Sequence, residues 1–112
     1  MNIVVLQGVV SRPAEMRELA DGTTLAMLEV ATETPTGRLV VPVAWSNPGR
    51  SVPEEGSDVV VTGQVRRRFF RTGGATQSRT EVVADAVVPA RSRSRARRAV
   101  EEALAGVWGG ES

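Results

Sequence analysis

The residues best suited to chemistry lie in one short stretch, where arginines and an aromatic side chain alternate. Arg66, Arg68 and Phe70 are spaced two residues apart, and side chains at that spacing share one face of a β-strand. Arg71 and Arg79 flank the glycine-containing segment that follows. Guanidinium groups bind phosphates, and an aromatic ring stacks on any nucleobase whose face is exposed. This stretch therefore predicts contact with a single-stranded nucleic acid, because a duplex exposes no base faces.

A structural interpretation of the aromatic residues stands beside the functional one. Phe69 and Phe70 could both belong to the core, with the arginines merely solvating a sheet edge. Trp45 ends a run of alternating apolar residues, so it could stack on a base or pack as an ordinary tryptophan. Trp108, near the end of the chain, favours packing or anchoring over base contact.

Residue types that most enzymes need are missing from the sequence. There is no Cys and no His, and all 14 basic residues are Arg. Thiolate nucleophiles, Cys/His zinc sites, His general bases, disulfides and Schiff-base lysines are therefore excluded. The adjacent pairs Glu54-Glu55 and Glu101-Glu102 organise neither a metal site nor an acid/base dyad. We predict a binding protein without enzymatic activity, catalytic residues, cofactor or metal.

The charge is distributed unevenly along the chain, although the net charge is only +1. Residues 1–63 carry 4 Arg and 8 acidic residues, which gives a net charge of −4. Residues 64–98 carry 10 Arg and 2 acidic residues, a net charge of +8, and residues 99–112 carry 3 acidic residues. A basic block of this kind is typical of proteins that meet phosphates, although solvated charge runs are also common.

The length of 112 residues allows one domain with a modest core. Apolar and polar residues alternate as far as residue 88, with breaks at Gly, Pro and Asp-Gly, which predicts an all-β barrel or sandwich. We expect five strands, at about residues 2–10 continuing through 15–19, then 24–33, 38–45, 58–70 and 80–88. Loops are expected at residues 46–57 and 71–78, and an edge or bulge at Pro42, which has no N–H to donate.

The sequence changes character after Pro89. The segment Arg91–Arg98 is arginine-rich, and apolar residues at helical spacing continue to Trp108, which predicts a short amphipathic helix. Arginines at the N-terminal end of this helix oppose its dipole, so we expect it to dock on a surface. We therefore divide the chain into residues 1–89 and residues 90–112. The N-terminus lacks the basic region and the length of a signal peptide or membrane span, so we expect a cytoplasmic protein with no membrane association.

Five motifs, in order, resemble the bacterial single-stranded DNA-binding protein family, which has an oligonucleotide-binding (OB) fold. They are the opening strand at residues 2–8, the segment from Gly8 to Arg17 with its Pro-Ala-Glu-Met-Arg sequence, the strand at residues 21–31, the glycine-serine strand at residues 56–66, and Thr-Glu-Val-Val-Ala-Asp at residues 80–85. The resemblance covers about residues 2–88. It implies a five-stranded Greek-key barrel over residues 1–89, followed by a short C-terminal α-helix.

The resemblance also implies a function and its residues. Phe70 stands at the position of a base-stacking aromatic, and Trp45 at an aromatic DNA-contacting position. The predicted DNA-binding residues are Arg12, Trp45, Arg66, Arg68, Phe70, Arg71 and Arg79. Family members form homo-oligomers, dimers or tetramers, partly through the first strand, so Ile3 and Val5 are interface candidates. The expected function is sequence-independent binding and protection of single-stranded DNA in replication, recombination or repair, in association with the nucleoid.

Departures from the family pattern modify this expectation. Leu39 replaces a common stacking aromatic, the hairpin at residues 34–37 is short, and the loop at residues 46–57 replaces a helix. The chain ends in Gly-Gly-Glu-Ser instead of an acidic tail with a hydrophobic tip, the route by which family members recruit protein partners. We therefore expect a specialised paralogue in which Arg91–Arg98 adds phosphate contacts. The alternative is a protein-interaction module with weak DNA binding, similar to primosomal assembly proteins.

Overall fold

The computed structural model describes residues 1–49 and 51–108, and within them the chain forms six strands and one helix. The strands are β1 (Val4–Val10), β2 (Glu15–Glu18), β3 (Thr24–Thr34), β4 (Gly37–Ser46), β5 (Asp58–Thr72) and β6 (Ala75–Pro89), and the helix is α1 (Arg93–Trp108). The prediction of a mostly β protein with a C-terminal helix is therefore confirmed. The first predicted strand is interrupted around Pro13, so it forms β1 and β2 separately.

The strands pair in an order that returns to its starting point. Along the sheet the order is β1-β5-β6-β4-β3-β2, and β1 also pairs with β3 through Val9 and Val10. Neighbouring strands are antiparallel except β4 and β6, which run parallel over Val43–Trp45. β1, β5, β6, β4 and β3 therefore form a closed ring, and β2 extends it beside β3.

The core inside this ring is small and consists mainly of valine. Its buried residues are Val10, Leu28, Val30, Val43, Val59, Val61, Val82, Ala84 and Val87. In β3 the residues Ala26, Leu28 and Val30 are all buried, which confirms the alternation expected for this strand. Strands β5 and β6 approach each other very closely at Gly63 of β5, where a Cβ atom would lie 2.0 Å from the carbonyl oxygen of Val83 in β6.

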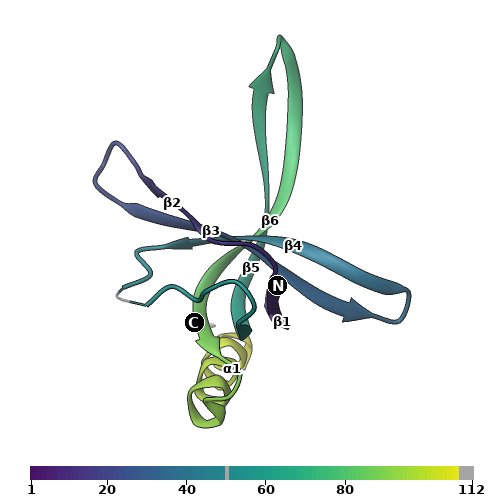
Figure 1. The fold of residues 1–112 in the computed structure, drawn as a ribbon, viewed down its shortest axis with the longest axis vertical. Coiled ribbons are helices and arrows are strands. Elements are labelled where there is room, and N and C mark those ends of the chain that lie inside the picture. Colours follow the sequence, from purple (N-terminus) through teal and green to yellow (C-terminus); the bar gives the residue numbers. More distant parts are fainter. Residues whose placement is uncertain (50, 109–112) are drawn as a thin grey trace.

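Three hairpins diverge from the ring (Figure 1). The β2–β3 hairpin closes at Asp21, whose Oδ1 accepts a 2.9 Å hydrogen bond from the Thr23 N–H. This hydrogen bond lowers the pKa of the Asp21 carboxyl below its ordinary value. The β3–β4 hairpin projects to another side, and residues 64–80 of β5 and β6 form the third hairpin, which we call the arm.

The arm replaces a loop that the sequence had predicted at residues 71–78. β5 continues to Thr72, β6 begins at Ala75, and only Gly73-Gly74 forms the turn. Both glycines have positive φ, at 59° and 84°, which is the conformation that two-residue hairpin turns require. The expected loop was wrong because this pair allows the strands to pair up to the turn, from Arg66 opposite Glu81 to Thr72 opposite Ala75.

Other irregular positions agree with the sequence. Residues 47–49 and 51–57 contain neither helix nor strand, as expected for the loop predicted there. Pro42 lies in β4 opposite Glu29 of β3, while the pairing of β4 with β6 covers only Val43–Trp45. Pro42 therefore lies on a stretch of edge, which confirms the expectation drawn from its missing N–H.

The helix α1 begins earlier than its apolar pattern indicated and includes most of the arginine-rich segment. It contacts β5 and β6, and Ala99 is buried against them, as expected for a helix that must dock. Figure 1 shows α1 and the arm at opposite ends of the molecule, along its 46 Å axis. No helix within residues 1–49 and 51–108 has the length and apolarity to cross a membrane.

Candidate nucleic-acid interface

One face of the arm carries the alternating arginines and Phe70. Arg66 lies opposite Glu81, Arg68 opposite Arg79, and Phe70 opposite Gln77 in the β5–β6 register. Directly opposed residues of an antiparallel pair project to the same side. The arm therefore brings together on one face Arg66, Arg68 and Phe70, which the sequence places in one strand, and Arg79, which the sequence places between that strand and the next.

Glu81 is the centre around which three arginines gather. Its side chain is only 1% exposed, and its Oε2 accepts a 2.5 Å hydrogen bond from Nη2 of Arg66. The Nε atom of Arg68 lies 3.4 Å from the same oxygen, and Nε of Arg79 lies 3.9 Å from Oε1. The three arginine side chains are themselves 42–49% exposed. One buried carboxylate thus neutralises one of three half-exposed positive charges.

Both phenylalanines of the arm are exposed. Phe69 is 65% exposed and Phe70 is 38% exposed, so neither belongs to the core, and the structural interpretation of these two residues was wrong. The Arg68 Cζ atom lies 5.7 Å from the centroid of the Phe70 ring, within the range of a cation–π contact. Phe70 therefore offers a ring that is held by a neighbouring cation and remains open to solvent.

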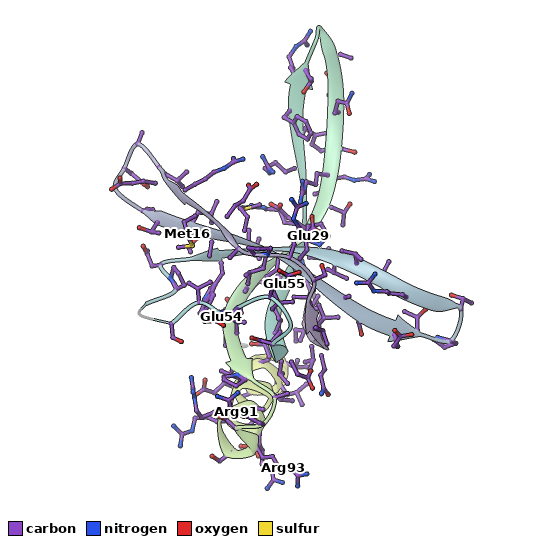
Figure 2. The ribbon with its side chains drawn as sticks, in the orientation of Figure 1. Met16, Glu29, Glu54, Glu55, Arg91 and Arg93 are labelled. Carbon is purple, nitrogen blue, oxygen red and sulfur yellow. The ribbon has the colours of Figure 1, made fainter. Side chains whose placement is uncertain are left out.

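The arginine face continues into a cleft of about 200 Å³, which we call the basic cleft. It is lined by Arg12, Pro13, Glu15, Arg17, Met27, Leu28, Glu29, Arg68 and Arg79. The β2–β3 hairpin and the segment before it thus form one wall, and the arm forms the other. Figure 2 shows Glu29 near the base of the arm, and Nη1 of Arg12 lies 3.6 Å from the Glu29 carboxylate.

The basic cleft has the chemistry of a phosphate-binding surface with an apolar floor. Its four arginines outnumber its two glutamates. Its lining also includes the buried core residue Leu28 and the half-buried Met27, of which Met27 adds apolar surface. Arg66 and Phe70 extend this surface along the arm. Such a surface binds an extended polyanion through charge while leaving room for flat apolar groups.

Two of the predicted DNA-binding residues lie elsewhere. Trp45 is half-buried against the core and lines a separate cavity of about 720 Å³, together with the loop after β4 and Arg91 and Arg95. Arg71 lies at the tip of the arm, where its Nη2 donates a 3.1 Å hydrogen bond to the Gly74 carbonyl oxygen. The structure therefore brings Arg12 together with Arg68 and Arg79, and separates Trp45 from them.

The interface candidates Ile3 and Val5 lie at the start of the first strand. Ile3 is half-buried and precedes β1, and Val5 is 48% exposed. β1 pairs with β5 along Val4–Val9, whereas among the described residues it pairs with β3 only at Val9 and Val10. The start of β1 thus has an open edge beside an exposed valine.

Sequence reasoning missed Glu81, Arg17 and the acidic residues of the basic cleft. Glu81 is one of only two acidic residues in the basic block of residues 64–98, and that contrast was the available signal. Its place opposite Arg66 depends on the register, which shifts between Thr62 and Gly63. The alternation within β5 alone contains no information about that register.

Comparison of the sequence with models of known protein families finds no match, and comparison with curated proteins finds none either. The basic cleft and the cavity beside Trp45 share no lining residue.

Proposed function

We propose that the protein binds single-stranded DNA without sequence preference, in the basic cleft and along the adjoining face of the arm. The observation that carries the proposal is the exposed face where Arg66, Arg68 and Arg79 surround Glu81, with Phe70 beside them. Phosphates are the same in every nucleotide, and an aromatic ring stacks on any base. Binding through these groups therefore recognises a single strand and not a sequence.

We propose further that the ring of strands is an OB-fold barrel of the kind found in bacterial single-stranded DNA-binding proteins. If β1 and β2 are counted as one interrupted strand, the ring contains five strands in Greek-key order. Such folds bind oligonucleotides between the loop that joins the first two strands and the loop that joins the last two. The β2–β3 hairpin and the arm are those two connections, and they are the walls of the basic cleft.

We also propose that the protein is a homo-oligomer, a dimer or tetramer that pairs through β1. The open edge at the start of β1 supports this, since an edge strand presents backbone groups that another copy can pair with. Val5, which lies at this open edge, is 48% exposed and is the apolar side chain that we expect a paired copy to cover.

A second candidate function is docking of a protein partner. Leu39 and Val40 follow each other in β4 and so project from opposite faces of the β3–β4 hairpin, and they are 52% and 42% exposed. Each face of this hairpin therefore offers one apolar side chain for contact with another protein. This function requires no selectivity for single strands. The two candidate functions therefore differ in the preference for single-stranded over duplex DNA, which a binding assay measures directly.

The test is a titration of a fluorescent oligothymidine with the protein at several salt concentrations, beside a duplex of equal length. We expect preference for the single strand. We also expect a plot of log affinity against log salt to have a slope of about −2 to −3.5, as three to five phosphate contacts to a single strand produce. Weak binding that does not distinguish the single strand from the duplex would contradict the proposal and favour the protein partner.

A further inference from the structure

We infer that Glu81 is a positioning residue, which holds Arg66, Arg68 and Arg79 in one fixed arrangement that receives the phosphates of the strand. This inference rests on the proposed function. It assigns a role to a side chain that is too deeply buried, at 1% exposure, to touch DNA itself. The four residues come from two strands, and the β5–β6 register places them around one point.

The contacts of Glu81 fix the direction in which two of the guanidinium groups face. Arg68 and Arg79 both approach the carboxylate with their Nε atoms, at 3.4 and 3.9 Å. The Nη atoms carry four of the five N–H donors of a guanidinium group. Anchoring at Nε therefore leaves the Nη groups of both residues for a ligand, and both residues line the basic cleft.

The three arginines would not hold this arrangement without the carboxylate. Positive groups that all lie within 4 Å of one carboxylate repel one another when that carboxylate is removed, and arginine side chains have many rotamers. Without Glu81 we expect the guanidinium groups to separate, so that binding a strand would require ordering them again. A preformed arrangement avoids that cost at the moment of binding.

The unsatisfied oxygen of Glu81 shows that this cluster is not optimised for stability alone. Oε1 has no hydrogen-bond partner within residues 1–49 and 51–108, and the Nε atom of Arg79 lies 3.9 Å from it, beyond hydrogen-bond distance. A buried carboxylate with an unsatisfied oxygen is costly, and apolar residues at such positions are often as stabilising. The cluster of Glu81 and its arginines is therefore better explained by the guanidinium groups that it presents to a ligand than by a contribution to stability.

The test asks whether removing the negative charge of Glu81 strengthens or weakens the binding of oligothymidine. Glu81→Gln makes the site more positive, so if the arginines acted only as charge the variant would bind oligothymidine more tightly. If Glu81 positions them, we expect binding about three- to tenfold weaker despite the added positive charge. Glu81→Asp keeps the charge and withdraws the carboxylate, and we expect it to weaken binding as well.

Glu15→Gln is the matched control, because it makes the same change of charge at an exposed carboxylate that lines the basic cleft. We expect this variant to bind about twofold more tightly, as added charge alone predicts. Binding by Glu81→Gln that equals or exceeds binding by the unaltered protein would overturn the inference and leave the proposed function standing. Absence of single-strand binding by the unaltered protein would overturn both.

A measurement on the unaltered protein covers the case in which the Glu81 variants fail to fold. In ¹H–¹⁵N spectra, the Nε–H signals of Arg68 and Arg79 should be observable and slow to exchange, because both groups face a buried carboxylate. They should stay slow to exchange when oligothymidine is added. Rapidly exchanging signals, like those of a freely moving arginine, would overturn the inference without any variant.

Discussion

At the scale of single residues, the two neighbouring phenylalanines of the arm show that an exposed ring is not necessarily placed to stack on a base. Phe69 and Phe70 are both exposed, but they lie on opposite faces of β5. Only Phe70 shares its face with Arg66, Arg68 and Arg79. The more exposed ring, Phe69, is therefore the one that we do not expect to stack on DNA in the basic cleft.

We predict that Phe70→Ala weakens oligothymidine binding by about 1–3 kcal/mol, the range for loss of one stacked base. Phe69→Ala should leave binding nearly unchanged, since its ring faces away from the arginines. Fluorescence anisotropy titrations of both variants, at one salt concentration, check this prediction. A larger loss for Phe69→Ala would mean that the strand passes over the other face of the arm.

The residue scale also shows where prediction from the sequence succeeded. The two-residue spacing of Arg66, Arg68 and Phe70 was sufficient to place them on one face, because strand alternation depends only on the local backbone. It could not identify Glu81 as their partner, because that contact depends on the pairing of two strands. Trp45 was grouped with Phe70 by motif resemblance, yet it lines a different cavity.

At the scale of elements, the ring depends on close strand crossings as well as on apolar alternation. The register of β5 and β6 shifts between Thr62 and Gly63, and Gly63 lies directly against the backbone of Val83. The shift precedes the arm and sets which residues of β6 oppose its arginines. The geometry of the basic cleft therefore depends on a glycine that does not line it.

We predict that Gly63→Ala destabilises the fold by about 2–4 kcal/mol, because the new methyl group would lie 2.0 Å from a backbone oxygen that cannot move aside alone. Gly106→Ala in α1 is the control, since nothing lies within 4 Å of a Cβ atom there. We expect it to stabilise the protein by about 0.5–1 kcal/mol, as alanine favours a helix. Urea denaturation of the two variants measures both effects, and equal midpoints would refute the prediction.

Most elements were predictable, and the exceptions have a physical cause. Alternation and turn residues located β3 and β4 closely, since their hairpin signals are local. The sequence predicts a loop at residues 71–78 because most of these residues are small or polar. Its strands are ordered by pairing around Gly73-Gly74, and the composition of either strand alone does not show this.

At the scale of the whole molecule, arginines gather at two opposite ends. The arm lies at one end, with the basic cleft at its base, and Figure 2 shows Arg91 and Arg93 at the other end, where α1 begins. Arg93 and Arg97, both in α1, are exposed. A strand held in the basic cleft reaches α1 only if it is long enough to pass along the molecule, whose longest dimension is 46 Å.

We predict that replacing Arg93 and Arg97 together with Gln has no effect on binding of an oligothymidine of about six nucleotides, which one OB fold can hold. For an oligonucleotide of about thirty nucleotides, the salt slope should become shallower by about 1.4, because two phosphate contacts are lost. Arg38→Gln, on the β3–β4 hairpin, is the control and should leave the salt slope unchanged for both the short and the long oligonucleotide. An unchanged salt slope for the long oligonucleotide would mean that α1 does not contact the DNA.

The most direct test of the central claim is to locate the strand by a ¹H–¹⁵N titration of the protein with a short oligothymidine. We predict that the shifted backbone signals concentrate in residues 12–17, 27–29 and 66–81, the walls of the basic cleft and the face of the arm. Signals of the loop after β4 should stay in place. Shifts concentrated around Trp45 and the start of α1, with the arm unaffected, would contradict the claim that the basic cleft is where this protein binds single-stranded DNA.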